Sequence, residues 1–500
     1  MISEQFPALI VVTPLILSFF IPVVGWWKRE LCLPIVLVAL SVCLLCAIGM
    51  LDTVIKHGTI HYRLGMWEPP WGIEYVVDHL NAFVLVIVSF ISLSAAIYAK
   101  RSVEQELLGH KIPAFYTLLL LNTTGLLGIT VTGDLFNLYV LLEIASFSAY
   151  GLIAIGEEGA LVASFRYIVM GTIGACLYLL GVGYLYIVTG SLNIADLSRI
   201  LPELYHSRVV LVAFAFFMVG IGIKMALFPL HVWLPDAYTH APSVVSAALG
   251  ATMTKVGAYV MIRVMFTVFK PYFSLEMIPA TTILGWVAVA AIIFGCILAI
   301  AQSDLKRMLC YILIAEVGYI AMGIGVANRM SLTGAILHIL NDAFMVACLF
   351  FVAGAIMYKM GTRDIRNFRY LHRKMPLTMA AFTIAALSVI GIPPTCGFFS
   401  KWYLILGAIY GGQWVFAVVL VLSSLLSAVV FFRVIEKVYF EPTVGIHNGE
   451  SHEMVEVVRD EAPLSMLIPI FIMVAGILLL GVFSGKIIST IIQFAVPTGF

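Results

Sequence analysis

Charged side chains are scarce in this chain. Asp, Glu, Lys and Arg make up 11% of its 500 residues, whereas hydrophobic residues make up 62%. Soluble domains carry about 25% charged and about 45–50% apolar residues, so the composition excludes an ordinary soluble enzyme or nucleic-acid-binding module. The 28 basic and 27 acidic residues nearly cancel, and the net charge therefore indicates no particular partner.

Motifs of secreted, redox-active and metal-binding proteins are also missing. The N-terminus has no basic segment and no small-residue cleavage site, which predicts that the first apolar run is a retained span. The eight cysteines lie in or beside apolar runs, and Cys43 and Cys46 form a C-x-x-C only inside an apolar stretch. We expect them to be packing residues, with no metal and no cofactor on this chain. The longest polar stretches are each too short to hold a core of their own, namely Gly58–His79, Lys359–Lys374 and Phe440–Glu461.

Long apolar runs dominate what is present. They are helix-length, far longer than the roughly 10-residue alternating segments of outer-membrane barrels, so the spans must be helices that close their own backbone hydrogen bonds. The sequence predicts an all-α polytopic membrane protein with about fourteen transmembrane helices. The expected spans lie near 7–26, 31–51, 80–99, 113–132, 134–154, 165–189, 209–229, 243–269, 279–301, 305–326, 330–357, 376–410, 414–438 and 463–483.

Basic residues are distributed unequally between the two sets of loops and span ends. One set holds 17 of the 28 Lys and Arg and the other holds 8, while three lysines lie inside the spans. Because cytoplasmic loops are enriched in Lys and Arg, we expect the 17-residue side to face the cytoplasm. An even number of spans puts both termini on the same side. The asymmetry therefore predicts a multi-pass protein of the inner (cytoplasmic) membrane with both termini outside.

Four ionisable residues lie within otherwise apolar stretches: Glu143, Lys224, Lys255 and Lys401. A lysine at the centre of a span costs roughly 2.5–3.5 kcal/mol, and an ionisable group at that depth is by default a candidate functional site. Such costly residues indicate a path for protons or cations. An isolated lysine could still be structural.

Proline interrupts two of these spans beside a lysine. Pro229 cannot donate to the carbonyl of Met225, the residue after Lys224, and Pro393 with Pro394 frees the carbonyls of Val389 and Ile390, near Lys401. Broken helices at membrane depth are tolerated where they are buried in protein or line a hydrated cavity. Proline kinks alone are common in membrane helices. Matching breaks in two halves instead favour an inverted repeat with its sites near the midplane.

Further polar residues share helix faces with these charges. Tyr139, Ser146 and Tyr150 lie on the face of Glu143, and Thr252, Tyr259 and Arg263 lie on the face of Lys255. In the eleventh span, His338 and Asp342 are spaced i and i+4, so that they can pair. A histidine in an apolar helix is more often a satisfied interior residue than a proton carrier, but the neighbouring acid and the comparable polar stripes keep both interpretations open here.

Four motifs resemble those of the antiporter-like subunits of respiratory complex I and its relatives. They are DLFNLYVLLE at Asp134–Glu143, KMALFPLHVWLPDAYTHAPS at Lys224–Ser243, TKVGAY at Thr254–Tyr259 and SDLKR at Ser303–Arg307. The segments Gly65–Glu74 and Val77–Asn81 are most similar to the D-type subunit of Mrp-type sodium/proton antiporters and its counterpart in membrane-bound group 4 hydrogenases. The resemblance covers nearly the whole chain.

The resemblance implies two inverted five-helix repeats with broken helices, at residues 113–270 and 279–440, flanked by segments 1–112 and 441–500. It implies a proton route in which Glu143 pairs with Lys224, Lys255 relays to the centre, and a second-half chain through His338 ends at Lys401. Asp236, His240, Tyr259, Glu316 and Asp342 are auxiliary polar candidates. The lack of a long lateral helix after the last span fits the members of roughly 500 residues.

The chain departs from the family pattern in the second half. Many relatives have His, His and Lys at the positions of His338, Asp342 and Val346, and His at the position of Glu316. The central lysine of the second half is therefore missing, which leaves open how a proton would cross between Lys255 and Lys401.

We expect an ion-translocating subunit, moving protons or sodium ions, within a multisubunit membrane complex. That complex is either an Mrp-type cation/proton antiporter or a redox-driven pump, with any redox centre on partner subunits. Two alternatives remain at this point. One is a stand-alone solute carrier with a substrate pocket, and the other is a non-conducting scaffold indifferent to loss of its lysines.

Overall fold

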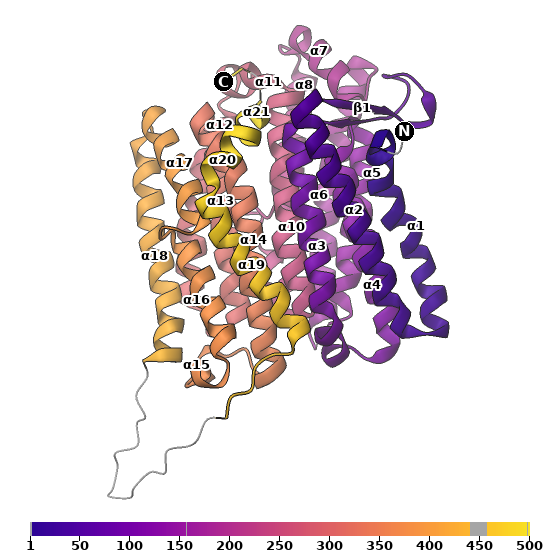
Figure 1. Ribbon diagram of the computed structural model, residues 1–500. Helices are drawn as coiled ribbons and strands as arrows, with labels where there is room; N and C mark the ends of the chain where they lie inside the picture. The colour runs from indigo at the N-terminus through magenta and orange to yellow at the C-terminus, as the bar shows by residue number, and fades with distance from the viewer. Residues whose placement is uncertain (1–2, 157, 441–457, 498) are drawn as a thin grey trace, which may run out of the picture.

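The computed structural model describes residues 3–156, 158–440, 458–497 and 499–500, and these are almost entirely helical (Figure 1). Twelve of the described helices are long and apolar enough to cross a membrane. They are α1 (Phe6–Trp27), α2 (Cys32–His57), α3 (His79–Glu106), α4 (Ile112–Val131), α5 (Leu135–Ala154), α6 (Ala160–Thr189), α10 (Ser243–Ile262), α12 (Ala280–Ile300), α13 (Leu305–Val326), α14 (Arg329–Met360), α18 (Trp414–Tyr439) and α19 (Leu464–Val482).

Two further spans are broken, as the prolines predict. The first consists of α8 (Arg208–Lys224) and α9 (Trp233–His240), and the second of α16 (Pro376–Ile390) and α17 (Cys396–Tyr410). With the twelve continuous helices they match the fourteen predicted spans, and the prediction of an all-α membrane fold is confirmed. Each broken span follows three continuous helices and precedes a fourth. The order of the described elements is therefore the same in both predicted repeats, whose boundaries remain a prediction.

Short elements cap the two ends of the molecule. Beyond the spans, the helical segments are α7 (Ile194–Leu204), α11 (Lys270–Tyr272), α15 (Leu371–Lys374), α20 (Ser484–Ile487) and α21 (Gln493–Ala495). Single 3-10 turns occupy Ser3–Gln5, Arg29–Leu31, Leu64–Met66, Gly109–Lys111 and Ile365–Asn367. π-helical turns occupy η5 (Arg263–Val268), η6 (Phe273–Met277) and η8 (Ile488–Ile492). The predicted polar stretch Phe440–Glu461 lies mostly outside the described residues.

The polar stretch after α2 forms a small hairpin that the residue pattern did not predict. Strands β1 (Ile60–Arg63) and β2 (Glu74–Val77) pair antiparallel, with Ile60 opposite Val77. Glu74 on β2 is buried and accepts a hydrogen bond of 2.8 Å from Asn193, just before α7. The hairpin therefore covers one end of the first predicted repeat.

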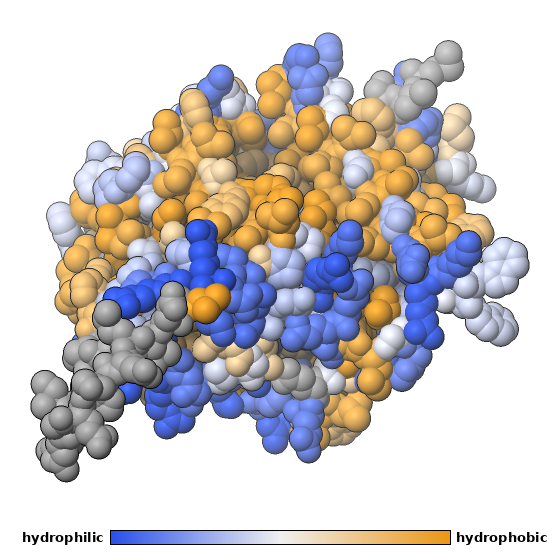
Figure 2. Space-filling view, turned by 60° about the horizontal axis from the view of Figure 1, so that its bottom comes forward, coloured by the Kyte–Doolittle hydropathy of each residue, from blue (hydrophilic) through white to orange (hydrophobic). Residues whose placement is uncertain are grey.

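Hydropathy divides the molecule into an apolar belt and polar ends. The end opposite the two termini carries a band of hydrophilic residues, and the sides above it are hydrophobic (Figure 2). Both termini lie at the other end (Figure 1), which agrees with an even number of spans.

Three helices form the centre of the molecule. The apolar windows of α10 and α14 are completely buried and that of α13 is 94% buried, whereas that of α1 is only 33% buried. The last span, α19, crosses in front of them at an angle (Figure 1) and contacts α3, α14, α16 and α17. Most of the predicted site residues lie on α10, α13 and α14 or on helices that contact them.

Candidate functional site

In the first predicted repeat, Lys224 and Glu143 face each other. Lys224 is the last residue of α8, and its Nζ lies 3.8 Å from Oε1 of Glu143 on α5. It also donates a hydrogen bond of 2.8 Å to Oγ of Ser146, one turn further along α5. The lysine side chain is 6% exposed and the glutamate 19%. The stripe on α5 thus supplies both a counter-charge and a hydroxyl.

The break in the helix directly after Lys224 shapes the backbone around this side chain. Ala226 adopts a positive φ of 58°, and Trp233 donates its indole N–H to the carbonyl of Ile223 at 3.1 Å. The neighbouring Met225 packs so closely on Gly257 of α10 that a Cβ there would lie 2.8 Å from that of Met225. The sequence predicted a free backbone acceptor at Met225, beside the charge. The hydrogen bond described for Lys224 goes to Ser146 instead.

Lys255 pairs with Asp342 across the boundary between the two predicted repeats. Nζ of Lys255 on α10 lies 2.6 Å from Oδ2 of Asp342 on α14, and the two side chains are 1% and 0% exposed. Lys255 also donates to the carbonyl of Gly250 at 2.8 Å. Helical spacing allowed Asp342 to pair with His338, but the ion pairs described for these two residues are with partners on other helices.

His338 instead meets Glu316. Its Nε2 lies 3.1 Å from Oε2 of Glu316 on α13, and its Nδ1 lies 2.9 Å from Oγ of Ser400 on α17. Both side chains of the pair are at most 1% exposed. The acid of α13 is thus matched by a histidine on the facing helix.

Lys401, the last of the predicted lysines, lies on α17 and has neutral partners among the described residues. Its Nζ donates to the carbonyl of Val389 at 2.5 Å, one of the two carbonyls that the proline pair was expected to free. It also lies 3.4 Å from the hydroxyl of Tyr319 and 4.4 Å from the centroid of that ring, a cation–π arrangement. Backbone, hydroxyl and ring electrons together hold this ammonium.

Tyr319 and Ser400 were not predicted from the sequence. Tyr319 follows Glu316 by three residues on α13, which places both on one helix face, and Ser400 directly precedes Lys401. Neither position has a distinctive residue type in an apolar helix. Only the neighbouring charges could have pointed to them.

Three auxiliary candidates lie apart from these pairs. Asp236 forms ion pairs of 2.7 Å with Arg166 and 3.4 Å with Arg307, and its carbonyl meets the ring of His240 at 2.9 Å. The hydroxyl of Tyr259 donates to a backbone carbonyl of α4 at 3.0 Å. These groups join α9, α6 and α13 at one end and α10 with α4 further along.

The paired groups follow a series of contacting helices through the centre of the molecule. Helix α8 contacts α10, α10 contacts α14, and α14 contacts both α13 and α17. We call the groups along this series the buried charge row. The row consists of Glu143, Lys224, Lys255, Asp342, Glu316, His338 and Lys401. Within the described residues, no group of three or more His, Cys, Asp or Glu is placed to hold a metal ion.

A family model described as "NADH:quinone oxidoreductase/Mrp antiporter, TM" matches residues 132–427. The chain is 46% identical over 99% of its length to the N-type subunit of the NADH-quinone oxidoreductase of Desulforudis audaxviator, of which 99% is covered. It is 34% identical to the D-type subunit of the Na(+)/H(+) antiporter of Alkalihalophilus pseudofirmus, with 77% of each chain covered.

Solved structures of large membrane complexes contain chains of the same fold. One is the Mrp complex from Dietzia sp. DQ12-45-1b, with a TM-score of 0.88 and 25% identity over 99% of this chain and 97% of that one. Another is the membrane-bound sulfane sulfur reductase, described as an archaeal respiratory membrane complex, with a TM-score of 0.89 and 29% identity over 98% of both chains.

Proposed function

Because the chain belongs to the NADH:quinone oxidoreductase/Mrp antiporter transmembrane family, we propose that it translocates protons or sodium ions as an antiporter-like subunit of a multisubunit membrane complex. The observation that carries the proposal is the buried charge row. Its three lysines, three acids and one histidine are costly at this depth, yet they lie on helices that contact one another.

The first pair can act as a switch. At 3.8 Å and an effective dielectric near 20, opposite unit charges attract by about 4 kcal/mol. Moving Glu143 away removes that attraction and favours release of the proton from Lys224. Moving one charge through 100 mV is worth about 2.3 kcal/mol, so the switch is matched in size to the work of translocation.

The Lys255–Asp342 pair supplies the step between the two halves. The family resemblance implies a lysine at the position of Val346, whereas here an acid on the same helix holds the lysine of α10 directly. A proton released at Lys224 would reach Lys255, and the Glu316–His338 pair would relay it toward Lys401. In this proposal, the acid-to-lysine contact takes the place of the second-half lysine that the resemblance implies.

The proposed partners are other membrane subunits of an Mrp-like or complex I-like assembly, because relatives of both kinds cover this chain. We further propose that the protein lies in the cytoplasmic membrane with both termini outside, as the 17-to-8 charge asymmetry supports. A tag at residue 500 that is accessible only from the cytoplasm would refute this orientation.

The test compares Lys224→Ala with wild type in the purified complex reconstituted into vesicles. We expect proton or sodium flux to be lost while complex content stays normal, because alanine removes an insertion cost. Glu143→Gln should give nearly the same loss, since it removes the counter-charge at constant size. Lys486→Ala, on an exposed lysine, is the control. Wild-type flux with Lys224→Ala would refute the proposal and favour a scaffold, and full coupled transport by the isolated chain would favour a stand-alone carrier.

A further inference from the structure

A groove between the end of α1 and the start of α4 opens at the end of the molecule opposite the two termini. Its volume is about 570 Å³, within the range of about 300–1,000 Å³ that ligand sites occupy. Helix α1 lies at the edge of the bundle (Figure 1), and its Trp26 and Trp27 are 91% and 95% exposed. Because tryptophan is enriched where a membrane meets water, we place the mouth of the groove at the depth of the lipid headgroups.

Arg29 brings a full positive charge to the mouth of this groove. Its guanidinium lies over the turn before α4, where a Cβ at Gly109 would be 2.7 Å from Nη1. Within the described part of the chain, this guanidinium has no hydrogen bond and no ion pair. His110 lines the same groove and adds a second basic side chain. The mouth therefore attracts an anion.

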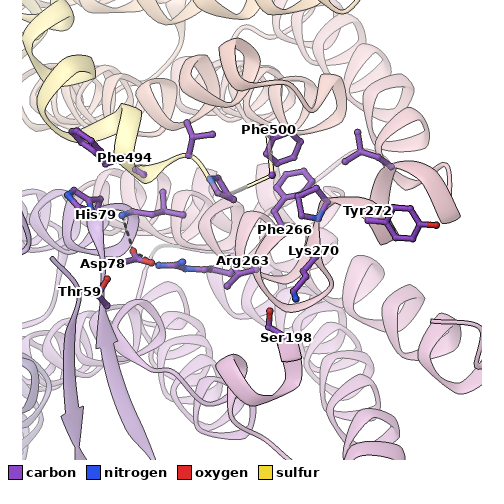
Figure 3. Close-up of a pocket in the computed structure, with 18 of the residues that line it drawn as sticks. Thr59, Asp78, His79, Ser198, Arg263, Phe266, Lys270, Tyr272, Phe494 and Phe500 are labelled. Carbon is purple, nitrogen blue, oxygen red and sulfur yellow. Dashed lines mark hydrogen bonds and ion pairs between the residues drawn. The ribbon is translucent and has the colours of Figure 1, made fainter. Parts of the chain in front are cut away.

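Arg263 shows the contrasting arrangement, in a cavity of about 880 Å³ at the end that carries the termini. Figure 3 shows its guanidinium directed at the carboxylate of Asp78, with Nη2 2.5 Å from Oδ1. Its Nε also donates to the hydroxyl of Tyr259 at 3.1 Å. The chain's own groups satisfy that guanidinium, whereas the guanidinium of Arg29 is left for a group from outside the chain.

Acids also lie near Arg29, but on its other side. A second cavity, of about 360 Å³, shares Arg29 with the groove and is lined by Glu30, Lys100 and Glu104 as well. Glu104 pairs with Arg101 at 3.0 Å, so these two acids are balanced by two cations other than Arg29. Among the described residues, no acid lines the groove between α1 and α4. The charge of Arg29 is thus not cancelled on the side of the groove.

The inner part of the groove is apolar. Pro22 on α1 and Leu118 on α4 line it about two helical turns from the mouth, a depth of roughly 10 Å. The hydroxyl of Thr117 donates to the carbonyl of Pro113 at 2.9 Å, so its hydrogen is not offered to a ligand. A cationic mouth followed by an apolar wall matches an amphiphile with an anionic head, whereas a free phosphate would gain nothing from the wall.

We propose that this groove binds an anionic phospholipid of the surrounding bilayer, with its phosphodiester at Arg29 and His110 and an acyl chain between α1 and α4. The charge asymmetry predicts that this end of the molecule faces the cytoplasm, and basic pockets between helices on that side bind acidic lipid headgroups. A zwitterionic lipid would bring an ammonium beside the guanidinium, with no carboxylate in the groove to receive it. The inference concerns lipid binding and does not depend on ion translocation.

The experiment titrates the complex, purified in detergent, with phosphatidylglycerol that carries a photoreactive diazirine in one acyl chain. After irradiation and digestion, mass spectrometry quantifies the labelled peptides. We expect saturable labelling of the peptides that contain Pro22 and Leu118. Arg29→Gln should weaken binding by about 10- to 100-fold, because a charge-assisted hydrogen bond to the phosphate is lost, and Arg29→Lys should restore part of it. Lys28→Gln is the matched control, since it removes a neighbouring exposed charge that does not line the groove, and it should leave the titration nearly unchanged.

A second variant tests the apolar wall. Ala114→Trp keeps Arg29 but fills part of the groove from an exposed position of α4, and it should also prevent labelling. Equal losses in Arg29→Gln and Lys28→Gln would indicate diffuse attraction and overturn the site, and equal competition by phosphatidylcholine would overturn the preference for an anionic lipid. Displacement by inorganic phosphate, with labelling indifferent to Ala114→Trp, would assign the groove to a free anion. Labelling confined to peptides of other subunits would show that a subunit covers the groove and would likewise overturn the proposal.

Discussion

The contact between Lys255 and Asp342 should make the two residues strongly interdependent. At 2.6 Å and an effective dielectric near 20, the attraction is about 6 kcal/mol. Removing one partner of a buried pair costs about 3–5 kcal/mol, because the other charge is left uncompensated. Removing both leaves no unpaired charge, and apolar replacements of similar volume are often neutral.

The perturbation is therefore a double-mutant cycle of Lys255→Met and Asp342→Leu. Thermal unfolding of the purified complex measures stability, and proton flux in vesicles measures function. We expect each single variant to be destabilised by about 3–5 kcal/mol and the double variant to recover most of that loss. Flux should be absent in all three, since none keeps both titratable groups.

The exposed pair of Lys56 and Asp52 provides the matched control. Its atoms are 2.8 Å apart, but the side chains are 61% and 59% exposed, so the same cycle should show coupling of only about 0.2–1 kcal/mol. Destabilisation that simply adds in the Lys255 and Asp342 variants would refute the pairing. Full flux in the recovered double variant would refute its part in translocation.

Three further predictions concern packing and charge. A Cβ at Gly171 of α6 would lie 1.9 Å from the hydroxyl of Tyr150, whereas a Cβ at Gly183 of the same helix would meet nothing within 4 Å. In thermal unfolding, Gly171→Ala should therefore be destabilised by about 1–3 kcal/mol. Gly183→Ala should be unchanged or slightly stabilised. Val346 packs on Gly250 of α10, where a Cβ would lie 3.3 Å from it, and the Gly250 carbonyl already accepts a hydrogen bond from Lys255. Val346→Lys therefore brings a second ammonium to this turn, so complex content should fall, and normal assembly would indicate a hydrated region. Burial alone would raise the pKa of Asp78, but the guanidinium of Arg263 and two backbone N–H groups hold that pKa below its usual value. The stabilisation by the carboxylate is therefore present above the ordinary carboxyl range and is lost as pH falls through the lowered pKa. The loss of stability in Asp78→Asn, measured by thermal unfolding, should accordingly shrink toward acidic pH.

The sequence predicted the spans and both breaks for simple physical reasons. A bilayer requires about 20 apolar residues per helix, and proline removes a backbone donor wherever it occurs. These are properties of short windows. Pro393 and Pro394 therefore predicted two free carbonyls near Lys401, and in the structure one of them, that of Val389, accepts its hydrogen bond.

Contacts between helices could not be predicted in the same way. Helical spacing shows only which residues share a face of one helix, so it could bring together Tyr259 and Arg263, or His338 and Asp342, but no pair on two different helices. In the structure, His338 and Asp342 turn to partners on other helices, Glu316 and Lys255. The pairing of Glu143 with Lys224 came from resemblance to a family, and spacing alone would not have suggested it.

The last span has a consequence for how the protein is made. α19 packs on the break of α16 and α17 so tightly that a Cβ at Gly481 would lie 2.0 Å from the carbonyl of Pro394, and it also contacts α3 near the start of the chain. During synthesis, α3 and both halves of the break leave the ribosome before α19. The break of α16 and α17 therefore stays uncovered on this side in the nascent chain until the last span has inserted, so the packing of the second half is completed only at the end of translation.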